Sequence, residues 1–139
     1  MREKKEMSDA PEVAKARACP FCDIPAQRVI MQNAHAYAIR DGYPVTDGHS
    51  LVIPKRHVED YFGLTPNELT ACDALLQSLR QSILHHDLSV AGFNIGANVG
   101  AVAGQTVFHC HIHLIPRREG DVANPRGGVR HTIPGKGEY

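Results

Sequence analysis

Several features that often reveal a protein's partner are missing from this 139-residue sequence. Its 15 Lys and Arg residues are balanced by 15 Asp and Glu residues, so the formal net charge is zero at pH 7. Nucleic-acid-binding domains usually carry a strongly basic face, so this balance argues against nucleic acid as the main partner. No apolar run approaches the roughly 18 residues of a membrane-spanning helix. The absence of a Gly-x4-Gly-Lys-Ser/Thr loop argues against kinase or ATPase chemistry.

The sequence also lacks internal repeats and any composition shift that would mark a domain boundary. Its length suits a single domain with its own core. Residues 1–17 are rich in charged residues and Ala and lack the apolar stretch of a signal peptide, so we expect a mobile or helical extension before a domain at 18–139. Only four cysteines occur, and without a secretory signal they predict reduced thiols and a cytoplasmic location.

Local patterns predict an α+β domain. Short apolar segments bounded by polar, Gly or Pro residues indicate strands at residues 28–31, 36–39, 50–54 and 93–97. Thr65, Pro66 and Glu68 combine a capping hydroxyl, a first-turn proline and a capping-box glutamate, which predicts the start of a long helix. The apolar stripe of that helix comprises Leu69, Cys72, Leu76, Leu79 and Ile83. We therefore expect an antiparallel sheet with this long helix and a shorter N-terminal helical segment.

The most informative segment contains His109, His111 and His113 at alternate positions in an apolar run. Alternate residues of a strand point to one face, so the three imidazoles are predicted to form a row. The residues that would face the core on the opposite side are Cys110, Ile112 and Leu114. The pattern alone leaves metal binding, proton transfer and nucleophilic attack open.

The flanks of this segment, residues 104–107 and 115–117, decide between these uses. Together with the histidines they resemble the histidine triad (HIT) family of nucleotide hydrolases and transferases, whose signature is met at every position from His109 to Ile115. The resemblance runs from about residue 19 to about residue 121. It implies a HIT-like fold, a nucleotide substrate and a homodimer that uses the long helix and the sheet edge.

Cys19 and Cys22 form a Cys-x2-Cys pair that suits a redox motif, half of a zinc site or two ordinary thiols. Pro25 stops any helix that a redox pair would open, which disfavours the first reading. The chain is similar to the prokaryotic zinc-containing branch of the family, and this similarity implies a structural zinc held by Cys19, Cys22, His57 and His109. The alternative is that no metal binds here, that His109 donates a hydrogen bond near the active histidine and that the cysteines remain metal-free.

The resemblance also implies the chemistry. His111 would be the nucleophile that attacks the α-phosphorus to form a nucleotidyl-histidine, and water or phosphate would then release the nucleotide from it. His113 would support the site by hydrogen bonding, and Gln105 would hold phosphate oxygens unless it is a plain strand residue. His49, just before a predicted strand, is expected to be structural.

The family's nucleotide-binding positions map onto this sequence as well. Asp41 would accept from ribose hydroxyls, although a loop aspartate is also a common turn former. The positions of the apolar base slot, for which core packing is the alternative, are Phe21, Ile24, Ile39 and Leu51. Asn98, Gln105 and Thr106 would lie near the phosphates.

The residues after the triad bear on the substrate. Pro116, Arg117 and Arg118 stand where the phosphoramidase branch typically has Gly-Gly, which favours a dinucleoside polyphosphate such as diadenosine tetraphosphate. Arg126 and Arg130 follow in the tail, and we expect some of these arginines to meet the extra phosphates. The alternatives are a nucleoside phosphoramidase, a non-catalytic nucleotide-binding module and a hydrolase that uses the histidines as zinc ligands.

Overall fold

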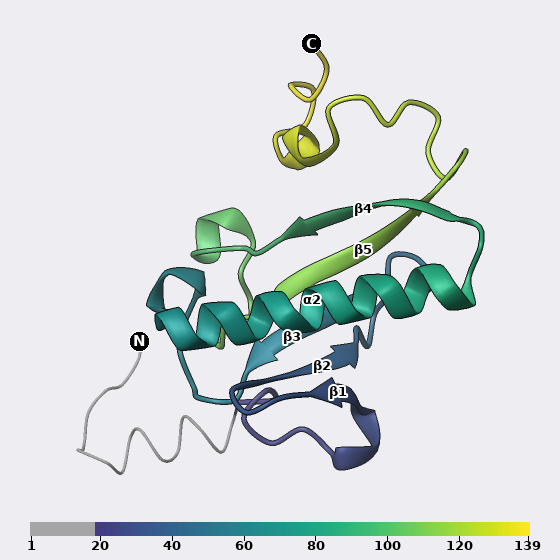
Figure 1. Cartoon of the computed structure of the whole chain (residues 1–139). Helices are drawn as coiled ribbons and strands as arrows, with labels where there is room; N and C mark the ends of the chain where they lie inside the picture. The colour runs from purple at the N-terminus through teal and green to yellow at the C-terminus, as the bar shows by residue number, and fades with distance from the viewer. Residues whose placement is uncertain (1–18) are drawn as a thin grey trace.

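The computed structural model describes residues 19–139, so the predicted N-terminal extension and its helical segment lie outside the described residues. The described chain is an α+β domain in which five antiparallel strands pair in the order β1-β2-β3-β5-β4 and one long helix, α2, crosses the sheet (Figure 1). The strands and helix are β1 (Val29–Gln32), β2 (Ala36–Arg40), β3 (Ser50–Pro54), α2 (Pro66–His86), β4 (Val90–Gly96) and β5 (Ile112–Arg118). The described residues also form short 3-10 turns: η1 (Ala26–Arg28) before β1, η2 (Tyr61–Gly63) and η3 (Ala101–Ala103) in the connections, and η4 (Gly128–Thr132) after β5. This arrangement confirms the predicted fold class.

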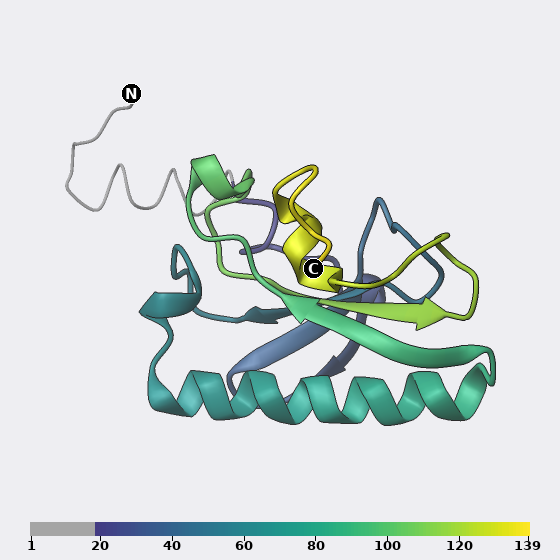
Figure 2. The ribbon, with the colours of Figure 1, turned by 90° about the horizontal axis from the view of Figure 1, so that it is seen from above.

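The sheet has two different faces. Viewed from above, α2 covers one face, while η3 and the C-terminal segment lie on the other side (Figure 2). Val52, Ile112 and Leu114 belong to the core beneath α2, whereas Ile39 and Leu51 belong to a second apolar cluster. Leu51 pairs with both Ile39 and His113 across the ladder, and directly opposed residues share a face. His113 therefore points away from α2.

The N-terminus of α2 is built as the sequence predicts. The Thr65 hydroxyl accepts a hydrogen bond from Glu68 N, and a Glu68 carboxylate oxygen accepts from Thr65 N, which completes the capping box. Glu68 is buried and also accepts two hydrogen bonds from Arg56, which ties the helix start to the loop after β3. The predicted stripe needs one correction: Leu75 is buried, whereas Leu69 is 43% exposed and Leu76 is half-buried.

Several strand boundaries differ from the prediction. Arg28 ends η1, so β1 begins one residue later than expected. β4 begins at Val90 rather than at residue 93, because Val90 pairs with Arg118 across an irregular register at Ala91. β5 begins only at Ile112.

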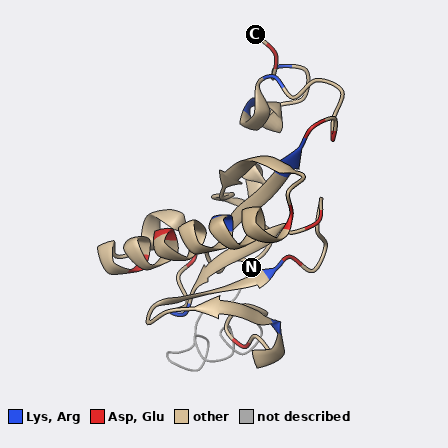
Figure 3. Ribbon diagram, turned by 45° about the vertical axis from the view of Figure 1, so that its right-hand side comes forward, with Lys and Arg blue, Asp and Glu red and all other residues tan. Residues whose placement is uncertain are grey.

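The described elements carry charges of both signs. Figure 3 shows basic and acidic residues interspersed along the described elements rather than gathered on one of them. Among residues 19–139, no helix combines the length and the apolar character needed to cross a bilayer.

Candidate active site and metal-binding cluster

Only the second half of the histidine segment lies in the sheet, because the chain bends at residues 107–109. β5 starts at Ile112, so His109 and His111 lie outside the ladder, and the expectation of one strand carrying all three is wrong in this detail. The physical reason is that Pro54, the last residue of β3, accepts a hydrogen bond from the His109 ring instead of from a strand backbone. Burial alternates as predicted from Cys110 through Ile112 to Leu114, but His109 is buried as well.

His109 is fully buried and its ring has a fixed orientation. Its Nε2–H donates to the Pro54 carbonyl oxygen at 2.8 Å, so a neutral ring keeps its lone pair on Nδ1. Burial lowers the pKa of His109, which favours this neutral form. Nδ1 then faces the sulfur atoms of Cys19 and Cys22, at 3.4 and 3.5 Å.

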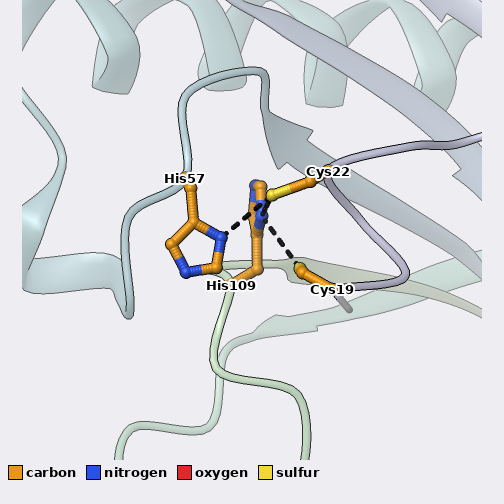
Figure 4. A group of neighbouring side chains, drawn as sticks. All are labelled: Cys19, Cys22, His57 and His109. Carbon is orange, nitrogen blue, oxygen red and sulfur yellow. Dashed lines mark hydrogen bonds between the residues drawn. The ribbon is translucent and has the colours of Figure 1, made fainter. Parts of the chain in front are cut away.

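Four side chains from three separate segments converge at this point (Figure 4). Cys22 Sγ lies 3.0 Å from His57 Nδ1, and the ligand atoms of Cys19, Cys22, His57 and His109 all lie within 4.8 Å of one another. Tetrahedral zinc with ligands at about 2.0–2.3 Å requires ligand atoms roughly 3.3–3.8 Å apart, which resembles this spacing. Burial and the neighbouring Cys19 raise the pKa of the Cys22 thiol to about 11, so a cation is needed to make it a thiolate at neutral pH. The cluster can hold a metal ion.

His111 is the next ring along the segment, and it is oriented by the residue that closes the metal cluster. Its Nδ1–H donates to the carbonyl oxygen of His109 at 2.8 Å. A neutral imidazole has one donor and one acceptor nitrogen, so this bond leaves the lone pair on Nε2. The edge of Phe21 packs against the ring, with centroids 5.0 Å apart. His111 thus has a fixed tautomer with its lone pair on Nε2, which is the form that a nucleophilic imidazole requires.

His113 is held by a second histidine. His49 Nε2 lies 2.9 Å from His113 Nδ1, and Asp41 Oδ2 lies 3.3 Å from the same His49 atom. Burial lowers the pKa of both rings, while the Asp41 carboxylate opposes this shift. His49 Nδ1 accepts from Val45 N, which places the proton of neutral His49 on Nε2. The hydrogen bond therefore runs from His49 to His113.

The four predicted slot residues do come together. Ile39 and Leu51 are buried at the centre of the apolar cluster on the face that carries His113, and Phe21 and Ile24 pack against them half-buried. The Tyr37 hydroxyl donates to the backbone carbonyl of Phe21, which fixes the segment that carries Phe21 over the sheet. Because Ile39 and Leu51 form the floor, Phe21 and Ile24 are the members with surface left for a planar ligand.

The polar residues predicted near the phosphates occupy the loop between β4 and β5. Gln105 is buried, and its amide donates to the backbone oxygens of Glu59 and Val107, at 2.7 and 3.1 Å. Its Oε1 accepts from Gly100 N at 2.9 Å. Gln105 thus braces this loop, while Asn98 and Thr106 are exposed on it. Their contacts with a nucleotide stay predictions.

This geometry agrees with what the chain resembles among known proteins. The model of the HIT domain family matches residues 23–120. The chain belongs to the HIT family. A HIT-like protein of Mycoplasma genitalium is 42% identical over 106 residues, which cover 73% of this chain and 74% of the relative.

Two solved HIT structures extend the comparison. A zinc-bound histidine triad family protein from Mycobacterium smegmatis is 37% identical, with a TM-score of 0.69 over 78% of this chain and 81% of that one. A hypothetical histidine triad nucleotide-binding protein from Sulfolobus tokodaii is 32% identical, with a TM-score of 0.64 over 74% and 71% of the two chains.

The arginines after the triad fall into two groups in this HIT domain. Arg117 forms two hydrogen bonds with the Asp121 carboxylate, and Arg118 pairs with Asp87 at 2.8 Å. Arg126 and Arg130 instead lie over the Tyr139 ring, at 4.9 and 4.7 Å from its centroid. The second group is therefore the better candidate for contacts with a long polyphosphate.

Two residues near the site make contacts that the sequence did not indicate. His49 was expected to be structural, and its ring contacts His113, which lies 64 positions away. Arg118 donates to the Thr46 hydroxyl and the Asp47 carbonyl, so it anchors the loop that leads to His49. A glycine-histidine pair directly before a strand was the available signal for His49, while Arg118 gave no local signal.

Proposed function

We propose that this HIT protein cleaves at the α-phosphate of a dinucleoside polyphosphate, such as diadenosine tetraphosphate, through a nucleotidyl-His111 intermediate. The observation that carries the proposal is the hydrogen bond from His111 Nδ1–H to the His109 carbonyl, which leaves the Nε2 lone pair for attack. A relative whose name describes it as nucleotide-binding supports the substrate class.

In the first step His111 Nε2 forms a bond to the α-phosphorus, and the bond from phosphorus to the bridging oxygen of the leaving polyphosphate breaks. His113, which accepts from His49 at Nδ1, carries its own proton on Nε2 and donates it as a hydrogen bond to the reacting group. In the second step water attacks the phosphorus, the bond to His111 breaks and the nucleoside monophosphate leaves. Inorganic phosphate in place of water would make the protein a phosphorylase.

The nucleotide is proposed to lie across the face opposite α2. Asp41, whose side chain is 16% exposed, accepts from the ribose hydroxyls, and the base contacts Phe21 and Ile24 over the floor of the slot. Asn98 and Thr106 face the phosphates from the β4–β5 loop, which Gln105 keeps in shape through its backbone hydrogen bonds.

We further propose a structural zinc at Cys19, Cys22, His57 and His109. The donor set fits, since two sulfurs and two imidazole nitrogens are the ligands that structural zinc prefers, and His109 keeps its Nδ1 lone pair toward the sulfurs. Zinc bound there would be coordinated by the thiolates of the two cysteines and would join three chain segments. It would not touch the substrate.

A cytoplasmic homodimer is the proposed working form. Ile95 on the edge strand β4 and Leu69 on α2 are 55% and 43% exposed, and both line an apolar hollow of about 370 Å³. Pairing two copies through this edge would cover both side chains and protect an open strand.

Product analysis tests the proposed activity. The wild type, His111→Ala and the control His35→Ala, which changes an exposed histidine in the β1–β2 turn, are incubated with diadenosine tetraphosphate and with an adenosine phosphoramidate. We expect AMP plus ATP from the wild type and the control, and loss of turnover in His111→Ala. ADP that appears only with added phosphate would indicate a phosphorylase.

Two results would move the protein to another class. Cleavage of the phosphoramidate alone would make it a nucleoside phosphoramidase. Lack of turnover on both substrates, or equal turnover by His111→Ala, would reject the His111 mechanism and leave a nucleotide-binding module.

A further inference from the structure

The single proton of His49 faces two acceptors. Because Val45 N–H donates to His49 Nδ1 at 3.1 Å, neutral His49 carries its proton on Nε2. That nitrogen lies 2.9 Å from His113 Nδ1 and 3.3 Å from Asp41 Oδ2. His113 and Asp41 therefore compete for one N–H group.

Asp41 is placed so that a ligand can change this competition. Its Oδ1 accepts from Tyr43 N at 2.8 Å, which orients the carboxylate and turns Oδ2 toward His49. The carboxylate is partly exposed, whereas the side chain of His49 is only 3% exposed. A ligand can therefore contact Asp41 directly, but it can affect His49 only through the side chains that His49 contacts, Asp41 and His113.

The same three side chains also have the spacing of a metal site. The hydrogen bond from Val45 argues against that use, because it keeps the proton on His49 Nε2, the atom that a metal would have to bind. The cluster is better suited to passing a hydrogen bond than to binding a cation.

We propose that Asp41 links ribose recognition to the orientation of His113. When ribose hydroxyls donate to Asp41, its carboxylate becomes a weaker acceptor and the His49 N–H turns fully to His113 Nδ1. His113 then holds Nε2–H toward the reacting phosphate. This inference rests on the proposed nucleotide cleavage and adds that the ribose increases turnover as well as affinity.

Steady-state kinetics on p-nitrophenyl esters of AMP and of 2′,3′-dideoxy-AMP test the link. In the wild type we expect kcat to be about 3- to 10-fold lower for the dideoxy ester, the size of one hydrogen bond, in addition to any rise in KM. In Asp41→Ala the His49 proton has only His113 as acceptor, so both esters should share one kcat. Asp47→Ala, an exposed aspartate in the same loop, is the matched control and should keep the wild-type ratio.

A split between kcat and KM decides the result. Equal kcat values for the two esters in the wild type, with only KM different, would mean that Asp41 simply binds ribose, and the link would be rejected. A kcat ratio that survives in Asp41→Ala would reject it as well.

A binding measurement keeps this test separate from the proposed activity. The ¹⁵N resonances of the His49 and His113 rings are expected to shift when AMP is added and to shift less with 2′,3′-dideoxy-AMP. If neither ester is turned over but this difference persists, the cleavage mechanism fails while the link stands. Identical shifts with both ligands would overturn the link whatever the activity.

Discussion

Removal of zinc is expected to destabilise the fold and stop turnover together. The cluster joins Cys22 to His57 across 35 residues and to His109 across 87. If the cluster is treated as a cross-link that closes the longer loop, it lowers the entropy of the unfolded chain and so raises the free energy of unfolding by about 4–5 kcal/mol. For a domain of this size, that corresponds to a Tm difference of about 10–20 °C.

The assay is thermal unfolding at defined free zinc and with excess chelator, for the wild type, Cys22→Ser and Cys72→Ala. Cys72 is a buried thiol on the core-facing side of α2, away from the cluster. Cys72→Ala should be less stable because it leaves a cavity, but its Tm should still differ between zinc and chelator. In Cys22→Ser this Tm difference should disappear.

Two outcomes would refute the reasoning. A wild-type Tm that is the same with zinc and with chelator would show that the cluster does not bind the metal. Turnover that disappears in chelator while the Tm stays high would show that the metal takes part in catalysis, because a structural zinc supports His111 only through the position of the His109 carbonyl.

Three shorter predictions concern the helix start, the tail and the sheet edge. The hydrogen bond from Arg56 lowers the pKa of Glu68 from 4.5 to about 2. Glu68→Gln should therefore lower the free energy of unfolding by about 1–3 kcal/mol at pH 7. Urea unfolding should show the gap between variant and wild type shrinking as the pH falls from 4.5 toward 2. Changing Arg126 and Arg130 to Ala is expected to raise the KM for diadenosine tetraphosphate about tenfold, and an unchanged KM would exclude the tail from phosphate binding. Ile95→Lys should yield a monomer by light scattering, and a persistent dimer would place the interface elsewhere.

The sequence predicted the elements best where a local signal fixes them. The capping box at Thr65 and Glu68 sets the start of α2 without help from the rest of the chain. Burial along α2 was predicted less well, because leucines at three- and four-residue spacing form overlapping stripes. Which stripe faces inward depends on how the helix sits on the sheet, and here Leu75 lies inside while Leu69 does not.

The candidate site shows the same division. The resemblance to the zinc-containing HIT branch, rather than spacing alone, implied that Cys19, Cys22, His57 and His109 converge, and the structure brings them together. The contact of His49 with His113 could not be read from either segment alone. It depends on the β2–β3 loop, which Arg118 anchors from β5 through Thr46 and Asp47.

The three alternating histidines show how one residue type can acquire three roles. A neutral imidazole has one donor and one acceptor nitrogen, so the partner of one nitrogen decides what the other can do. The Pro54 carbonyl accepts from His109 Nε2–H, which leaves Nδ1 of His109 for a metal. The His109 carbonyl accepts from His111 Nδ1–H, which leaves Nε2 of His111 for phosphorus. His49 donates to Nδ1 of His113 and leaves it an N–H donor. The proposed ligand, nucleophile and hydrogen-bond donor thus differ only in the group that each ring meets on its protein side, and a change in that group should exchange one role for another.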